Sequence, residues 1–336
     1  MKILMVGGTG IISTAVSNLL VDQGHELYLL NRGLHTHFAP KGAKILIGDI
    51  NDEGHIKDLI KDDFFDVIAN WIIGLPEQIE RDIRLFSNKT SQYIFISSAS
   101  AYQHPTKHYI ITEETPLKNL YWEYSRKKIE CENRIMKEYK ENGFPVTIVR
   151  PSLTFGETVI PYVLTSWKDP WSIIHRMKVE KRIIVPGDGT SLWTITFNTD
   201  FAAGFIGLLG NKKTIGEAFH ITSDEVLTWN DVVEQMADVV GVKSNPVHIS
   251  SEFIVKFMPD QIGNLFGDKM TSSVFDNSKL KAFVPDFKAK VTFKEGFAKS
   301  YAYLKSHPEL QTVDEKYEVH LDKVIRAFDY GMSYEN

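Results

Sequence analysis

The chain has few features that would place it in a membrane or outside the cell. Its 336 residues include a single cysteine, Cys131, which excludes a disulfide within the chain. No run of apolar residues is long enough to span a bilayer, and residues 1–6 run directly into glycines without the layout of a signal peptide. The sequence therefore predicts a soluble, cytoplasmic protein with no membrane partner.

Clustered positive charge is also missing. The chain has 38 Lys and Arg residues against 43 Asp and Glu residues, a net charge of -5 at pH 7, and its basic residues are scattered. Because nucleic-acid affinity depends mainly on clustered Lys and Arg that neutralise phosphates, this balance argues against a nucleic-acid partner. The hydrophobic content of 43% suits one large domain, or a large domain with a smaller companion.

The first 150 residues alternate between short apolar runs and amphipathic stretches. Strands are predicted at residues 3–6, 27–30, 44–47, 67–70, 93–97 and 146–149. Helices are predicted directly after the first strand and at residues 52–60, 76–86 and 123–139. This alternation is typical of a parallel sheet covered by helices on both faces. The predicted fold class is therefore α/β, with a doubly wound, Rossmann-like sheet whose carboxyl edge collects the ligand-binding residues.

A glycine-rich stretch, residues 7–10, lies between the first strand and the first helix. Glycines here let the backbone turn sharply and approach a pyrophosphate, which the N–H groups and dipole of the following helix attract. We therefore expect a bound dinucleotide; the alternative is that the glycines only form a tight connection. Ser13 replaces the third glycine of the usual fingerprint and is expected to widen the helix–sheet spacing slightly. The cofactor-binding residues predicted at this turn are Gly7, Thr9, Gly10, Ile11 and Ile12.

The end of the second strand bears on which dinucleotide binds. The acidic residue that would accept hydrogen bonds from a ribose 2′-hydroxyl is absent, and Asn31 and Arg32 stand there instead. A guanidinium can make bidentate contacts to a 2′-phosphate, so Arg32 modestly favours NADP over NAD. The alternative is that Arg32 is a solvated loop residue and Asn31 alone holds the ribose.

After residue 150 the alternation becomes irregular, because prolines and a Gly-Asp-Gly turn at residues 187–189 interrupt it. Helices are predicted at residues 200–209, 230–240 and 293–304, and an amphipathic helix carries Tyr317, Leu321, Val324 and Phe328 on one face. We interpret residues 1–150 as the dinucleotide-binding domain, with late strands contributed from about residues 190–222. Residues 151–336 are interpreted as a smaller substrate-binding lobe interwoven with it, ending in the amphipathic helix.

Tyr124 and Lys128 lie one turn apart on a predicted helix, so their side chains share a face. A free phenol has a pKa near ~10, and lowering it by about three units requires about 4 kcal/mol of preferential stabilisation of the phenolate. The Lys128 ammonium and a positive nicotinamide ring are expected to supply this stabilisation. Ser98, at the end of the fifth strand, is placed to bond a substrate oxygen. We predict Ser98, Tyr124 and Lys128 as catalytic residues; the alternative is an aromatic core residue beside a solvated lysine.

Together these motifs resemble the extended short-chain dehydrogenase/reductase family, of the NAD-dependent epimerase/dehydratase type. The matching segments run along most of the chain: residues 6–12 (VGGTGII), 48–50 (GDI), 96–102 (ISSASAY), 112–116 (TEETP), 124–128 (YSRKK), 149–152 (VRPS) and 276–279 (DNSK).

The resemblance implies further cofactor contacts. It implies that Asp49 and Ile50 contact the adenine, that Lys128 also bonds the nicotinamide ribose, and that Tyr124 lies against the cofactor. The other cofactor-binding residues that it implies are Ala69, Asn70, Trp71, Ser97, Pro151, Ser152 and Leu153. The family often forms homodimers through two packed helices, for which this chain offers Ile79, Ile83, Phe86, Ile129, Ile135 and Met136.

The resemblance leaves the reaction open. Family members that eliminate water carry an Asp-Glu pair directly after the strand-end hydroxyl residue, and this chain has Ala99 and Ser100 there. A dehydratase is therefore disfavoured. We predict an NAD(P)-dependent epimerase that oxidises and re-reduces a nucleotide-sugar-type substrate; the alternatives are an NADPH-dependent carbonyl reductase, or a non-catalytic dinucleotide sensor or RNA-binding relative.

Substrate contacts are expected from the second lobe and from Ser98 and Ser100. The polar and aromatic candidates are Trp167, Trp171, Arg176, Trp193 and Asn198, with Arg176 first, although each is equally consistent with core packing or surface charge. The loop histidines His35, His37, His104 and His108 lack the paired spacing of metal ligands, so no metal is predicted.

Overall fold

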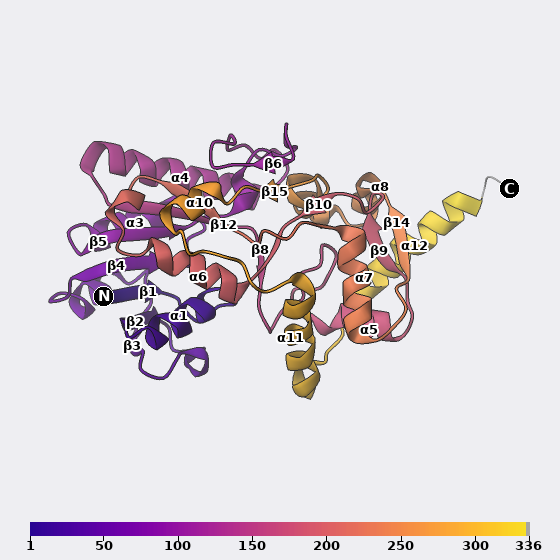
Figure 1. The fold of residues 1–336 in the computed structure, drawn as a ribbon, viewed down its shortest axis with the longest axis horizontal. Coiled ribbons are helices and arrows are strands. Elements are labelled where there is room, and N and C mark those ends of the chain that lie inside the picture. Colours follow the sequence, from indigo (N-terminus) through magenta and orange to yellow (C-terminus); the bar gives the residue numbers. More distant parts are fainter. Residues whose placement is uncertain (334–336) are drawn as a thin grey trace.

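A seven-stranded sheet organises the first part of the chain. The computed structural model describes residues 1–333 (Figure 1). All neighbouring strands of the sheet are parallel, in the order β12-β7-β5-β4-β1-β2-β3. They are β1 (Lys2–Val6), β2 (Glu26–Asn31), β3 (Lys44–Ile47), β4 (Phe65–Asn70), β5 (Thr90–Ile96), β7 (Val146–Pro151) and β12 (Ala218–Ile221). The predicted α/β class is confirmed.

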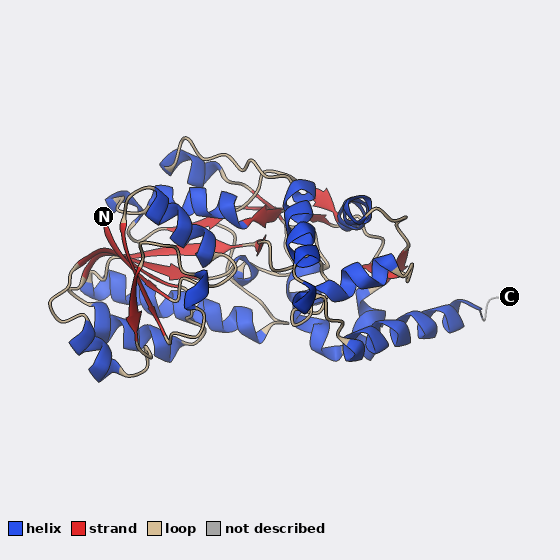
Figure 2. Cartoon of the chain, turned by 90° about the horizontal axis from the view of Figure 1, so that it is seen from below, coloured by secondary structure: helices blue, strands red, loops and turns tan. Residues whose placement is uncertain are grey.

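Helices cover both faces of this sheet (Figure 2). Successive residues of a strand point to opposite faces, so Ile3 and Met5 pack in one apolar cluster while Leu4 and Val6 pack in another. The first cluster includes residues of α1 (Ser13–Asp22) and α6 (Asn198–Leu208). The second includes residues of α2 (Glu53–Leu59), α3 (Pro76–Phe86) and α4 (Glu123–Asn142). Burial on both faces explains why these strands read as continuous apolar runs.

Cys131 lies in the second of these clusters. Its side chain is buried beneath α4, one turn after Lys128 toward the carboxyl end of the helix. Burial raises the pKa of the Cys131 thiol to about 12. The thiol is therefore protonated at neutral pH.

The second lobe lies beside the carboxyl ends of the strands (Figure 1). It has its own apolar core, which includes Ile174, Trp229, Phe297 and Val324. Its helices are α5 (Trp171–Lys178), α7 (Trp229–Val240), α8 (Ser251–Phe257), α9 (Ile262–Asn264), α11 (Phe293–Ser306) and α12 (Glu315–Met332). Its short strand pairs are β9 (Ile183–Pro186) with β14 (Pro246–Ile249), β10 (Leu192–Trp193) with β13 (Leu227–Thr228), and β11 (Ile195–Phe197) with β8 (Leu153–Phe155).

The chain crosses between the two parts more than once. Of the late strands expected at about residues 190–222, β12 joins the large sheet beside β7, whereas β10 and β11 pair outside it. Further along, β15 (Val274–Phe275) pairs with β6 (Ile110–Ile111), and α10 (Ser278–Phe283) packs near β12 and α6. No helix within residues 1–333 is both long and apolar enough to cross a membrane.

Candidate active site

The glycine turn is built by two residues with left-handed backbone. Gly7 has φ +100° and Gly8 has φ +92°, whereas Gly10 lies outside this region. A Cβ on Gly8 would approach Cδ2 of Leu29 to 2.6 Å, so a side chain does not fit there. Ser13, expected to widen the helix–sheet spacing slightly, also contributes to the turn, because its Oγ accepts a 2.9 Å hydrogen bond from the N–H of Gly10.

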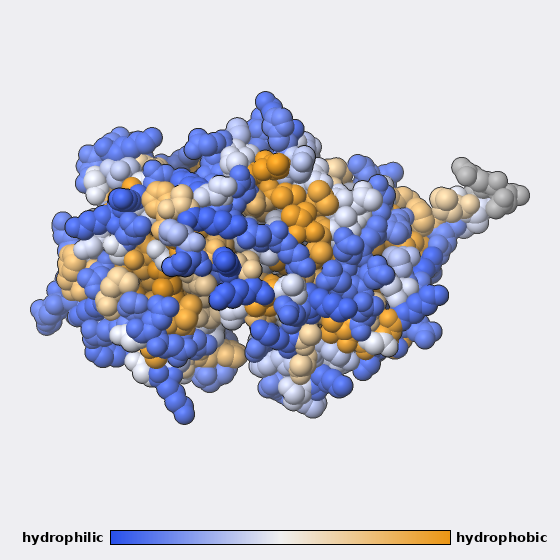
Figure 3. All heavy atoms as spheres, viewed as in Figure 1, coloured by the Kyte–Doolittle hydropathy of each residue, from blue (hydrophilic) through white to orange (hydrophobic). Residues whose placement is uncertain are grey.

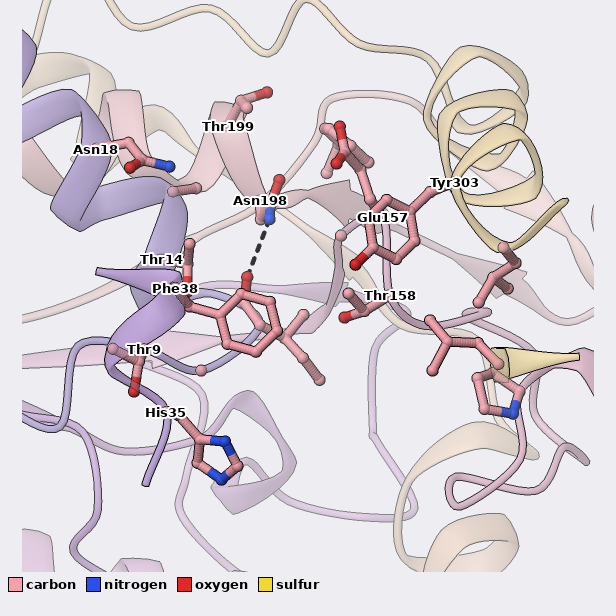
Figure 4. Close-up of a pocket in the computed structure, with 18 of the residues that line it drawn as sticks. Thr9, Thr14, Asn18, His35, Phe38, Glu157, Thr158, Asn198, Thr199 and Tyr303 are labelled. Carbon is pink, nitrogen blue, oxygen red and sulfur yellow. Dashed lines mark hydrogen bonds between the residues drawn. The ribbon is translucent and has the colours of Figure 1, made fainter. Parts of the chain in front are cut away.

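A second contact holds the turn from the start of α6. The side-chain amide of Asn198 donates a 2.9 Å hydrogen bond to the carbonyl of Ile11 (Figure 4). Gly156 makes room for this amide, since a Cβ there would lie 2.3 Å from Asn198 Nδ2. Asn198, considered above as a substrate residue, thus has a structural contact to the glycine turn. Sequence offered no signal for it, because the two residues are far apart along the chain.

A cavity of about 360 Å³ adjoins this turn at the carboxyl ends of β1 and β2. Residues predicted for the cofactor form much of its wall, namely Gly7, Thr9, Asn31, Arg32, Asp49 and Ile50. Asn31 Nδ2 is buried and has no hydrogen-bond partner among residues 1–333, which is unusual for a buried donor. An adenosine with its ribose hydroxyls fits this wall, because it offers the acceptor that Asn31 lacks.

The predicted cofactor residues at the end of β4 have different contacts. The Asn70 amide is fully engaged, since Oδ1 accepts from the Ile72 N–H at 3.0 Å and Nδ2 donates to Asp82 Oδ2 at 2.5 Å. Trp71 lies against the glycine turn, and its Nε1 is buried without a partner in the described part of the chain. Ala69 is buried in the strand.

Lys128 is buried at the centre of the predicted catalytic group. Its Nζ donates to the carbonyls of Ile73 at 2.5 Å and Ile96 at 2.8 Å, and lies 5.8 Å from the centroid of the Tyr124 ring. Burial lowers the pKa of Lys128 to about 8. Its ammonium is therefore fixed by the end of β5 and by the loop between β4 and α3, beside the Tyr124 ring.

Tyr124 has a different pKa shift from the one expected. Desolvation raises the pKa of its phenol above the usual value near 10, the nearby charge of Asp268 adds to the rise, and a hydrogen bond with Ser98 opposes it. Because 44% of the residue's surface is exposed, we expect the shift to be small. The lowering expected from Lys128 together with a positive nicotinamide ring stays a prediction; in the protein alone the ammonium donates to two carbonyls. The phenol is protonated at neutral pH.

A row of hydroxyls fixes Ser98 next to Tyr124. Ser98 Oγ lies 2.9 Å from Ser100 Oγ, which accepts a 2.8 Å hydrogen bond from Ser125 Oγ on α4. Ser97, predicted for the cofactor, instead directs its hydroxyl at Glu132 Oε1, 2.5 Å away. Glu132 also forms a buried ion pair with Arg150 of β7, which ties α4 to the sheet.

The predicted cofactor residues at the end of β7 and directly after it offer few free polar groups to a ligand. Ser152 Oγ donates to the Thr194 carbonyl at 3.2 Å, Pro151 is buried at the end of β7, and Leu153 is half-buried at the start of β8.

Two residues predicted to contact the substrate, Arg176 and Trp193, are buried instead. Arg176 is 2% exposed, and its guanidinium forms ion pairs with Glu318 and Asp322 of α12, so assigning it to the substrate is wrong. Trp193 is also buried, and its Nε1 donates to the Lys269 carbonyl. The sequence alone does not indicate whether an arginine will form an ion pair with a distant carboxylate in the folded protein.

Part of the proposed dimer surface belongs to the core, as expected for some of its residues. Ile79, Phe86 and Ile135 are fully buried within one chain, and Ile83 is 9% exposed. These side chains pack between α3, α4 and the sheet, whereas Ile129 and Met136 are half-buried, and the dimer stays a prediction.

A larger cavity than the one described above lies on the other side of the glycine turn. It encloses about 1250 Å³ between α1, the loop after β2, and α11, and opens as a notch between the two lobes (Figure 3). Thr14 and Phe38 face Thr158 and Tyr303 across it (Figure 4). Trp167 lines its wall, but Tyr124 does not. Within residues 1–333, no group of three or more His, Cys, Asp or Glu residues is placed to hold a metal ion.

Comparison with known proteins identifies the family. Residues 3–222 match the model of the NAD dependent epimerase/dehydratase family, and the chain belongs to this family. The resemblance inferred from the motifs is confirmed.

Individual relatives differ in what they do. The chain is 29% identical over 255 residues to the chloroplast stem-loop binding protein of 41 kDa b of Arabidopsis thaliana, covering 71% of this chain and 63% of that protein. It is 28% identical over 170 residues to UDP-glucose 4-epimerase of Lactobacillus helveticus, covering 45% of this chain and 51% of that enzyme. The chain thus spans between half and two thirds of these two relatives.

The fold is shared with solved epimerases. A UDP-glucuronic acid 4-epimerase from Bacillus cereus, solved in complex with NAD, superposes with a TM-score of 0.71 at 18% identity. The match covers 94% of this chain and 99% of that enzyme. Similarity at this level shows a common fold.

Proposed function

We propose that this protein is an NAD(P)-dependent epimerase acting on a nucleotide-sugar-type substrate. The observation that carries the proposal is the Lys128 ammonium, which lies 5.8 Å from the centroid of the Tyr124 ring and donates to the carbonyl of Ile73. Ile73 follows Ile72, which lines the cavity suited to an adenosine. Residues 1–150 with β12 would form the dinucleotide-binding domain, and residues 151–336 would supply most of the substrate lobe. Solved relatives that bind NAD and a UDP-sugar support this choice of class.

The proposed chemistry uses Tyr124 as the proton carrier. Ser98 donates a hydrogen bond to the reacting substrate oxygen, and its own position is fixed by Ser100. As phenolate, Tyr124 takes the proton of the substrate hydroxyl, so that the substrate O–H bond breaks and the phenol O–H bond forms. Tyr124 returns this proton after the ketone has turned in the site.

The cofactor would contribute only the acceptance and return of a hydride. A bound nicotinamide would supply the acceptor for a hydride from the substrate carbon and its donor on return; Gly7, Thr9, Asn31 and Asp49 line the cavity that would hold the dinucleotide. The chain's contribution is to hold Tyr124 and Lys128 in place and to lower the phenol pKa once further positive charge is present. The protein alone does not achieve this lowering, because desolvation of the phenol dominates.

An isotope experiment tests the proposal directly. The purified protein is incubated with UDP-glucose or UDP-glucuronic acid deuterated at C4, without an added hydride donor, and the products are followed by NMR. We expect the C4 epimer with the deuterium retained, together with dinucleotide that co-purifies with the protein. Product that appears only with added NADPH would indicate a carbonyl reductase. Absence of both bound dinucleotide and turnover would overturn the proposal.

We also propose that Arg32 favours NADP. Arg32 is exposed at the rim of the nucleotide cavity, beside Asn31, whose Nδ2 has no hydrogen-bond partner among residues 1–333. Arg32→Ala is expected to weaken NADP binding about tenfold or more, because a hydrogen bond to a charged group contributes about 1.5–3 kcal/mol. NAD affinity should stay within about twofold. Isothermal titration of both dinucleotides measures this. Lys41→Ala removes an exposed charge from the same loop and serves as the control; an equal effect there would contradict the argument.

RNA binding is the second candidate function. It is favoured by the 29% identity to a chloroplast protein named for stem-loop binding. The net charge of -5 opposes it. A stem-loop RNA titrated against the wild type and Tyr124→Phe distinguishes the two functions, since RNA affinity would not depend on the phenol.

A further inference from the structure

Asn119 connects three segments of the chain with one side chain. It lies between β6 and α4 and is 2% exposed. Its Nδ2 donates to the Ser100 carbonyl at 2.9 Å and to the Gly267 carbonyl at 2.6 Å. Its Oδ1 accepts from the N–H groups of Tyr121 at 3.2 Å and Trp122 at 2.9 Å. Both donors and both acceptor positions of this amide are therefore used.

Two of the three segments carry predicted catalytic residues. Ser98 lies two residues before Ser100, and the two hydroxyls are hydrogen-bonded. Tyr124 lies two residues after Trp122, and the centroids of these two rings are 5.3 Å apart. The Asn119 amide thus fixes the loop of Ser98 against the start of the helix that carries Tyr124.

The third segment belongs to the second lobe and fits tightly around Trp122. A Cβ on Gly263 would lie 2.4 Å from Trp122 Cδ1, and one on Gly267 would lie 2.9 Å from Trp122 Cβ. The same segment forms a π-helical turn, Leu265–Lys269, a form often found at functional sites. Its Lys269 carbonyl accepts hydrogen bonds from two buried tryptophans of the lobe, Trp193 and Trp229. The turn is therefore anchored in the second lobe while it contacts Trp122.

We propose that Asn119 is a positioning residue, which sets the separation of Ser98 and Tyr124 and couples both to the second lobe. It acts through other residues, because its polar atoms are all engaged and none is left for a ligand. Ser100 and Trp122, which the Asn119 amide contacts, each lie two positions from a catalytic residue. A small displacement of the amide therefore moves both catalytic side chains. This inference rests on the proposed function, since it assigns Asn119 to the same Ser98–Tyr124 site.

The test compares Asn119→Ala with Asn264→Ala. Asn264 is a matched control, because its amide also links segments, donating to the Val163 carbonyl at 2.7 Å and Gln261 Oε1 at 3.0 Å, yet contacts neither catalytic segment. Asn119→Ala should lower kcat about tenfold or more, because misplacement of reacting groups by about 1 Å can cost up to ~10²-fold. The Kd for the dinucleotide should be unchanged in both variants, and Asn264→Ala should keep its kcat.

A second readout does not need turnover. The Tyr124 ring resonance in protein labelled with 13C-tyrosine, assigned with Tyr124→Phe, should shift in Asn119→Ala, because the Asn119 amide holds Trp122, whose ring centroid lies 5.3 Å from that of Tyr124. It should not move in Asn264→Ala. This result would support Asn119 even if no epimerase activity were found. If Asn119→Ala does not fold, Gly267→Ala, which presses on Trp122, should give the same shift. A Tyr124 resonance unchanged in the folded variant would overturn the inference.

Discussion

Tyr124→Phe is expected to lower kcat by about 100-fold or more and to leave the Kd for the dinucleotide unchanged. Proton transfer by a positioned side chain contributes about 10²–10⁴ to rate, and the substitution removes only the hydroxyl that carries the proton. The ring keeps its contact with Trp122 and its place over the Lys128 ammonium. Single-turnover kinetics and dinucleotide titration measure the two quantities separately.

Tyr121→Phe is the matched control for this prediction. Tyr121 precedes α4, is 37% exposed and contacts Phe266 through its ring, but has no lysine four residues later. Its loss of a hydroxyl should leave kcat within about twofold, as for most exposed substitutions. Equal activity of Tyr124→Phe and the wild type would remove Tyr124 from the chemistry.

Lys128→Met is expected to have the largest combined effect on activity and stability. The substitution puts an unbranched apolar side chain, one atom shorter, in place of the lysine and leaves the Ile73 and Ile96 carbonyls without their shared donor, at a cost of about 1–3 kcal/mol for each buried group. It also removes the positive charge beside Tyr124, so kcat should fall about 100-fold or more. Urea unfolding and steady-state kinetics give the two values. Lys127→Met, whose ammonium is 3.9 Å from Glu130, is the control.

The pH dependence of stability and of activity in the wild type follows from the titration of Lys128. In the folded protein the pKa of Lys128 is about 8, below its ordinary value of 10.5, so the unfolded chain binds more protons between these two values. This group's contribution to stability therefore rises as the pH increases from about 8 to about 10.5. Over the same range the ammonium is lost, and kcat should fall. An activity profile that stays flat through pH 8–10 would contradict the role given to Lys128.

Much of the fold could be predicted because the helices and strands have distinct apolar periods. The helix expected at residues 76–86 was predicted with its observed bounds, and the sheet strands were placed to within a few residues. These strands are buried on both faces, so their apolar runs are unambiguous. The short strands β10 and β11 fall in the region expected to supply the late strands, but their pairing with β13 and β8 depends on contacts between distant segments.

The site was only partly predictable for a related reason. Tyr124 and Lys128 lie four residues apart on one helix, so their position on a shared face could be predicted from the sequence. The link from Asn119 to Gly267 spans 148 residues, and the partners of Arg176 lie on α12, more than 140 residues away.

The burial of Cys131 has a practical consequence for following motion in this molecule. With its one native thiol protonated and covered by α4, the chain should react slowly with maleimides and nitroxide reagents. Cysteines introduced on the outer surfaces of the two lobes would then carry the fluorophores or spin labels, without first replacing the native residue. Distance measurements across the notch between α1 and α11 thereby become accessible in the otherwise unaltered protein.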